Sequence, residues 1–198
     1  MVTKSSLLLT LFLVLSAAQS LNAQPRNLLQ NADASHGKES WRPYGDTAVE
    51  TLGGYSSFVV RNGGNFSQDV ELPKDASGQF AVFVGRGSID RVNSGGGITG
   101  IPYLYGYMMQ PSHGPDEKEI LAYLQGQGML AQIRFVDEWA NMWGVFEVPR
   151  GTTKIRFLLC QGLQKNVPHD GSAARFTTLG LYLFPTKEDA GAFVSQYR

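Results

Sequence analysis

Apolar residues along this chain fall into short runs that are separated by clusters of Gly, Pro, Asn and Asp. Within a run, apolar residues tend to recur at every second position, as Phe66, Val70 and Leu72 do. This period of two is typical of β-strands with one buried face. The candidate strands are 55–62, 66–73, 78–87, 101–110, 119–127, 142–149, 152–162 and 174–185. Many short strands with turn signals between them predict an all-β fold, a sandwich or a barrel.

The turn residues predict one strand pairing. Pro149 and Gly151 lie in a Pro-Arg-Gly-Thr sequence that is typical of a tight turn. Runs 142–149 and 152–162 are therefore expected to pair as a hairpin.

Only the C-terminal end of the chain has helical spacing. Thr186 is a candidate helix cap, and Ala190, Phe193, Val194 and Tyr197 follow at i, i+3, i+4 and i+7. We expect this apolar stripe to pack on the sandwich, because such stripes usually contact their own core. A helix that binds a partner protein is the alternative.

The first residues have the pattern of a secretory signal peptide, with Lys4, an apolar run at 7–18 and a small residue, Ala23, at a plausible cleavage point. The apolar run is short for a membrane span, although an uncleaved anchor is the alternative. We therefore expect residues 1–23 to be removed and 24–198 to form one domain. That domain would be exported, either secreted or held in the periplasm or cell envelope, with no integral membrane segment.

Charge and cysteine content exclude some classes of function. Without residues 1–23, 16 basic residues face 17 acidic ones, so there is no electrostatic reason to expect nucleic acid or an anionic membrane as partner. Cys160 is the only cysteine, which rules out a disulfide within the chain. Its apolar neighbours indicate a small buried hydrophobe.

Enzyme motifs are absent from the sequence. It has no H-E-x-x-H metal motif and no G-x-S-x-G nucleophile elbow. Asp137 and Glu138 are adjacent carboxylates, but neighbouring residues on a strand point to opposite faces, whereas a glycosidase needs two carboxylates on either side of one sugar. Solvated edge charges are the favoured interpretation, and a glycoside hydrolase is the weaker alternative.

Aromatic and amide side chains are the most abundant candidates for a binding site. Tyr and Trp offer an apolar face with a polar tip, which suits stacking on sugars. The period of two places three tyrosines of one run on a single face, which either faces a ligand or fills the core; Trp41 and Trp143 are expected in the core. The candidate ligand-binding residues are Tyr103, Tyr105, Tyr107, Tyr123, Gln125, Trp139 and Asn141.

The first residues after the predicted signal resemble the start of galactose-binding-like jelly rolls, a group that includes many carbohydrate-binding modules and the F-box-associated domains. The resembling positions are Asn27, Leu28, Leu29, Asn31, Asp33, Gly37 and Trp41. Runs 66–73, 78–85, 144–159 and 171–184 also resemble strands of that group, in the same order. The resemblance implies a jelly-roll β-sandwich and suggests a carbohydrate ligand.

A structural calcium ion is common in related sugar-binding modules, and here its expected ligands are incomplete. Thr177 and Thr178 stand in the last strand where acidic residues are usual, and Ser35 stands where Glu is common. Asp33 is left as a weak metal candidate, because calcium prefers six to eight oxygen ligands with several carboxylates. We therefore predict no cofactor and no metal, with calcium as the less favoured alternative.

Two classes of function remain open beside the hydrolase. The first is an exported, non-catalytic module that binds carbohydrate or glycoconjugate. The second is a structural or protein-interaction domain of the cell envelope, with its aromatic residues in the core. The sequence leaves the oligomeric state open. Asn65 lies in an Asn-Phe-Ser sequon, which is a glycosylation site only in a eukaryotic host.

Overall fold

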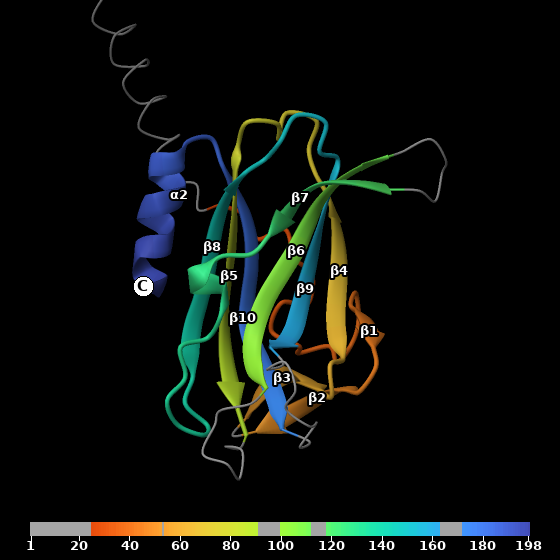
Figure 1. The fold of residues 1–198 in the computed structure, drawn as a ribbon, viewed down its shortest axis with the longest axis vertical. Coiled ribbons are helices and arrows are strands. Elements are labelled where there is room, and N and C mark those ends of the chain that lie inside the picture. Colours follow the sequence, from red (N-terminus) through yellow and green to blue (C-terminus); the bar gives the residue numbers. More distant parts are fainter. Residues whose placement is uncertain (1–24, 53, 91–99, 112–117, 163–171) are drawn as a thin grey trace, which may run out of the picture.

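The computed structural model describes residues 25–52, 54–90, 100–111, 118–162 and 172–198. The strands in these ranges form two five-stranded antiparallel sheets that pack face to face (Figure 1). The predicted all-β sandwich with a short C-terminal helix is thus confirmed. The signal peptide expected at residues 1–23 lies outside the described residues.

The two sheets, called A and B, each mix strands from both halves of the chain. In order, sheet A contains β1 (Arg42–Tyr44), β4 (Asn65–Glu71), β9 (Lys154–Gly162), β6 (Ile101–Pro111) and β7 (Lys118–Leu124). Sheet B contains β2 (Thr47–Leu52), β3 (Tyr55–Arg61), β10 (Ala173–Phe184), β5 (Phe80–Ile89) and β8 (Ala140–Glu147). The helical segments are η1 (Gln127–Met129), α2 (Lys187–Val194) and η2 (Ser195–Tyr197).

The hairpin predicted for β8 and β9 is wrong, because the two strands lie in different sheets. The turn between them crosses the sandwich instead. Before the turn, the Val148 amide donates to the Gln79 carbonyl, next to β5. After it, the Thr153 amide donates to the Met109 carbonyl of β6. The turn chemistry was recognised correctly, but the turn joins two sheets and not two neighbours in one sheet.

The core lies between the sheets and is rich in aromatic rings. Phe83 of sheet B stacks on Phe157 of sheet A, with ring centroids 4.7 Å apart. Trp41 is 4% exposed and meets Phe157 edge-on, so its expected place in the core is confirmed. Trp143 differs, because it lies half-buried on the outer side of sheet B with the Arg198 guanidinium 4.8 Å above its ring.

The Asn-Leu-Leu sequence at the start of the domain ties the chain to β10. The Asn27 side-chain amide donates to the Leu179 carbonyl, and its oxygen accepts from the backbone amides of Leu29 and Leu181. Leu29 is then buried in the core. One asparagine thus holds the first segment against the last strand.

Helix α2 covers one end of the outer face of sheet B (Figure 1). Thr186 caps it, because the Thr186 hydroxyl accepts from the Asp189 amide at 3.1 Å. Ala190 and Val194 are buried against Val82 and Val84 of β5. The expectation that the helical stripe packs on the sandwich is confirmed. Among the described residues, no helix is long and apolar enough to span a membrane.

Candidate functional site

The three tyrosines of β6 point away from the core. Pro102, Leu104, Gly106 and Met108 are buried on the inner side of the strand, and the tyrosines that alternate with them are half-buried on the outer side. Tyr103 also contacts the margin of the core cluster. Of the two interpretations left open by the sequence, the structure selects the outward one.

Four tyrosines form one continuous row, which we call the tyrosine ribbon. Its members are Tyr103, Tyr105 and Tyr107 of β6 and Tyr123 of β7, which is the register partner of Tyr107. Successive ring centroids lie 6.0, 5.2 and 5.6 Å apart. Tyr123 is 64% exposed at the end of the row. Contacts at these distances make one aromatic surface rather than four separate side chains.

Gly106 explains how β6 can carry this row. A Cβ atom at Gly106 would lie 2.6 Å from the Arg156 carbonyl oxygen of β9 and 3.2 Å from the Phe83 ring. Because glycine avoids both contacts, β6 lies closely over the Phe83 ring while Tyr105 and Tyr107 face outward. The Tyr-Gly-Tyr sequence therefore serves both the core and the outer surface.

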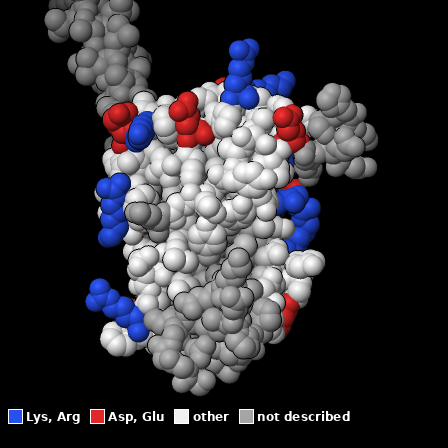
Figure 2. Space-filling view, viewed as in Figure 1, with Lys and Arg blue, Asp and Glu red and all other residues white. Residues whose placement is uncertain are grey.

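The hydroxyls of Tyr103 and Tyr105 remain protonated at neutral pH. Burial raises the pKa of Tyr103 and of Tyr105, and the neighbouring tyrosine hydroxyls raise it further. The Tyr103 hydroxyl donates to the Gln125 side-chain oxygen at 3.1 Å. Gln125, a candidate from the sequence, thus lies at the ribbon. The space over β6 carries no charged side chain among the described residues that face the viewer in Figure 2.

A charged network borders the ribbon on the β9 side, and sequence reasoning missed it. Arg156, the register partner of Tyr107, binds Asp69 through two hydrogen bonds of 2.6 and 3.0 Å. Arg42 contacts the same carboxylate at 2.7 Å. Burial opposes ionisation of Asp69, yet the bonds from Arg156 and Arg42 hold the pKa of its carboxyl well below its usual range. The available signal was Arg156 itself, a charge at an outward position next to the apolar residues of β9.

Cys160 lies on this same outer face and not in the core, where its apolar neighbours had suggested it would be. It is half-buried, and its register partners are Asn65 of β4 and Tyr103 of β6. Burial raises the pKa of the Cys160 thiol to about 11. The thiol is therefore protonated, and much less reactive than a free cysteine, at neutral pH.

Two of the seven candidate residues lie on the opposite side of the molecule. Trp139 immediately precedes β8 in sheet B and lines a pocket on the outer face of that sheet. Asn141 of β8 is exposed and is the register partner of Arg86. The structure brings together Tyr103, Tyr105, Tyr107, Tyr123 and Gln125, and it separates Trp139 and Asn141 from them.

The acidic residues singled out from the sequence, Asp33 and Glu138, accept hydrogen bonds from residues close to them in the chain. The Asp33 carboxylate accepts from the Ser35 amide and hydroxyl, and the Ser35 hydroxyl in particular lowers the pKa of Asp33. Among the described residues, no group of three His, Cys, Asp or Glu side chains is placed to hold a metal ion. Glu138 accepts from the amides of Arg134 and Phe135, which closes a turn.

Comparisons with protein-family models and with curated proteins give no match. Many solved structures resemble the chain, among them the following three. The enzymatically active domain of tailspike protein 4 from bacteriophage CBA120 has a TM-score of 0.54 and 12% identity, covering 80% of this chain and 21% of that one. The C-terminal family 22 carbohydrate-binding module of Clostridium thermocellum Xyn10B has a TM-score of 0.52 and 10% identity, covering 81% and 97%. The CBM22-2 xylan-binding domain from Paenibacillus barcinonensis Xyn10C has a TM-score of 0.52 and 14% identity, covering 77% and 98%.

The chain thus spans about a fifth of the tailspike structure and nearly the whole of both modules. At these identities the likeness concerns the fold. The chain has a jelly-roll β-sandwich fold, as the resemblance of its sequence implied.

Proposed function

We propose that this chain is an exported, non-catalytic carbohydrate-binding module that holds a neutral polysaccharide chain across the tyrosine ribbon. The observation that carries this proposal is the row of four tyrosine rings on the outer face of sheet A, each in contact with the next.

The ribbon supplies both parts of sugar recognition. Aromatic faces bury the apolar faces of sugar rings, and polar groups beside them fix the orientation of the hydroxyls. Here the fixing groups are the tyrosine hydroxyls, the Gln125 amide and the Arg156 guanidinium beside Tyr107. Since the row runs along β6 and turns onto β7, it suits an extended chain of sugars better than a single ring.

A neutral ligand fits the electrostatics of the ribbon. The phenols of Tyr103 and Tyr105 stay uncharged, because their pKa values are raised. The charges next to them already face each other in the network of Arg42, Asp69 and Arg156. A cationic chain would compete with these two arginines for the Asp69 carboxylate.

The test is retention of the purified protein by a panel of soluble neutral polysaccharides in affinity gel electrophoresis, followed by titration calorimetry on the retained one. Tyr105→Ala removes the middle ring of the row, and we expect it to weaken binding at least about tenfold, or 1.4 kcal/mol. Tyr44→Ala is the matched control, because Tyr44 is 70% exposed on the far edge strand of the same sheet.

Either of two results would contradict the proposal: no retention on any neutral polysaccharide, or equal loss with Tyr44→Ala and Tyr105→Ala. In the first case a protein-interaction domain becomes the better interpretation. Phe135 and Val136, which are 70% and 38% exposed, give that alternative its own apolar surface.

A further inference from the structure

A cavity opens on the outer face of sheet B, the side of the sandwich opposite to the tyrosine ribbon. Its volume is about 310 Å³. The lining combines aromatic rings, hydroxyls and guanidinium groups, and we call it the arginine pocket. The lining residues are Tyr55, Ser56, Ser57, Arg86, Trp139, Arg175, Thr177 and Thr178.

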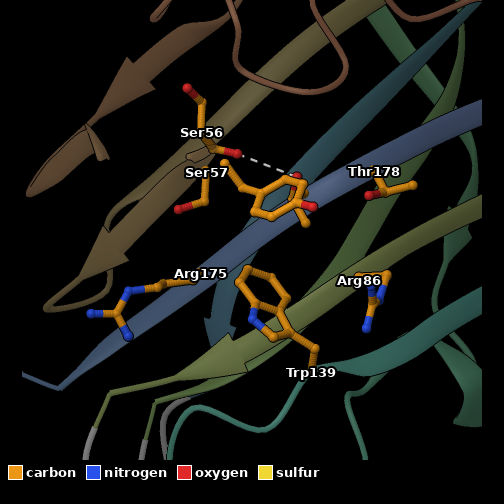
Figure 3. Close-up of a pocket in the computed structure, with 8 residues that line it drawn as sticks. Ser56, Ser57, Arg86, Trp139, Arg175 and Thr178 are labelled. Carbon is orange, nitrogen blue, oxygen red and sulfur yellow. Dashed lines mark hydrogen bonds between the residues drawn. The ribbon is translucent and has the colours of Figure 1, made fainter. Parts of the chain in front are cut away.

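The lining groups converge from several strands. Figure 3 shows Trp139 between Arg175 of β10 and Arg86 of β5, with Thr178 across the space from it; the Ser56 hydroxyl points away from this space and contacts the Thr51 hydroxyl at 3.2 Å. Arg86 and Arg175 reach the pocket from adjacent strands, because β5 and β10 pair along this stretch. An aromatic ring with a cation on each side and a hydroxyl opposite is a different chemistry from that of the ribbon.

The lining of the pocket holds two arginines and, among the described residues, no carboxylate. Arg175 is held in place from outside the pocket by Asp90 at 3.8 Å and Asp137 at 3.4 Å. Arg86 is exposed, and within the described part of the chain no carboxylate lies within 4.0 Å of its guanidinium. Of the two arginines in the lining, Arg86 is therefore the one without an ion pair in the described part of the chain, whereas Arg175 already faces two carboxylates.

The backbone is strained at the same place. Thr178 has a φ of 52°, in the left-handed region that β-branched residues rarely adopt. It lies in the bulge where the pairing of β10 with β5 shifts, between Thr177 and Gly180. Strain of this kind persists at positions where the surrounding structure holds it, and these are often ligand sites. Here the bulge places Thr178 in the pocket lining.

We propose that the arginine pocket binds one sugar ring that carries a carboxylate, a hexuronate. The carboxylate would pair with Arg86, the ring would lie against Trp139, and the Thr178 hydroxyl would bind a ring hydroxyl. A volume of 310 Å³ is near the lower end of ligand pockets, which span about 300–1,000 Å³, and suits a single ring. This site is independent of the ribbon, so it stands whether or not the ribbon binds a neutral chain.

The test compares binding of galacturonate and glucuronate with binding of galactose and glucose, by ligand-observed NMR titration of the full protein. We expect a uronate to bind at least about tenfold more tightly than the matching neutral sugar, because charge-assisted bonds to arginine are the strongest available here. Arg86→Gln should remove that preference. Since Arg86 is exposed, the variant should fold, and its near-ultraviolet circular dichroism checks this.

Arg150→Gln is the matched control, because Arg150 is exposed in the turn after β8 and outside the pocket. It should leave uronate binding unchanged, and Trp139→Phe should weaken it less than Arg86→Gln does. Equal binding of uronate and neutral sugar, no uronate binding, or equal losses with Arg86→Gln and Arg150→Gln would overturn the proposal. Tyr105→Ala separates the two sites, because it should weaken polysaccharide binding and leave uronate binding intact.

Discussion

The two outer faces of this sandwich are built on similar five-stranded sheets and present opposite chemistry. The outer face of sheet A carries the tyrosine ribbon, whose rings contact one another and include the uncharged phenols of Tyr103 and Tyr105. The outer face of sheet B is covered at one end by α2 and holds the arginine pocket elsewhere. In a strand, every second side chain belongs to the core and the others are free to vary. The outer faces therefore diverge while the inner faces stay alike.

Both faces nevertheless depend on a single core. Phe83 belongs to the strand that carries Arg86, and Phe157 belongs to the strand that carries Arg156. These two phenylalanines stack on each other between the sheets, with their ring planes 7° apart. A change to this stack reaches both outer faces, whereas a change to one outer face leaves the other in place.

Disrupting the stack of Phe83 and Phe157 should destabilise both outer faces together. We expect Phe157→Ala to lower the free energy of unfolding by about 3–5 kcal/mol, because Phe157 is fully buried and its loss leaves a cavity. Urea denaturation followed by tryptophan fluorescence measures this. Tyr123→Ala, at a 64% exposed position, should cost less than about 1 kcal/mol. Similar losses in the two variants would mean that the faces are not supported by one core.

The charged network gives the stability of sheet A a pH dependence. Because the folded protein depresses the pKa of Asp69, its contribution to stability is complete above the unfolded pKa near 3.8 and is lost as the pH falls below it. Asp69→Asn should cost about 1–3 kcal/mol at pH 7, since it removes hydrogen bonds to a charged group. This cost should shrink steadily between pH 5 and pH 2.

Urea denaturation at several pH values measures the Asp69 effect, and Glu71→Gln on the same strand is the control. Glu71 pairs with Lys154 at 2.6 Å but its side chain is 72% exposed, so its loss should cost less than about 1 kcal/mol. A cost of Asp69→Asn that is the same at pH 3 as at pH 7 would contradict the assignment.

Local features of this fold were predictable from the sequence. The period of two placed Tyr103, Tyr105 and Tyr107 on one face, because the strand backbone fixes that alternation. Thr186 and the stripe after it predicted α2 for the same kind of local reason. The sequence left open which way the tyrosines point, since tyrosine is suited both to a protein core and to a solvent-exposed surface.

Features that depend on pairing between distant strands were not predictable. Trp139 and Asn141 were grouped with the tyrosines, but β8 pairs with β5 in the other sheet. Asp69 and Arg156 are 87 residues apart, so nothing local indicates that they meet. The arginine pocket was missed for the same reason, because its residues come from four separate segments of the chain.

The smallest effect is expected for a variant of α2. This variant tests whether the helix contributes to either binding surface or only covers sheet B. Thr186→Ala removes the cap of α2 and should lower the free energy of unfolding by about 1 kcal/mol. Thr186→Ser keeps a hydroxyl in the same place and should restore most of it. Because α2 packs on Val82 and Val84, away from both the tyrosine ribbon and the lining of the arginine pocket, neither polysaccharide nor uronate binding should change in either variant. A change in uronate binding with Thr186→Ala would mean that the helix holds the arginine pocket in shape, and the two ends of sheet B would then act as one unit.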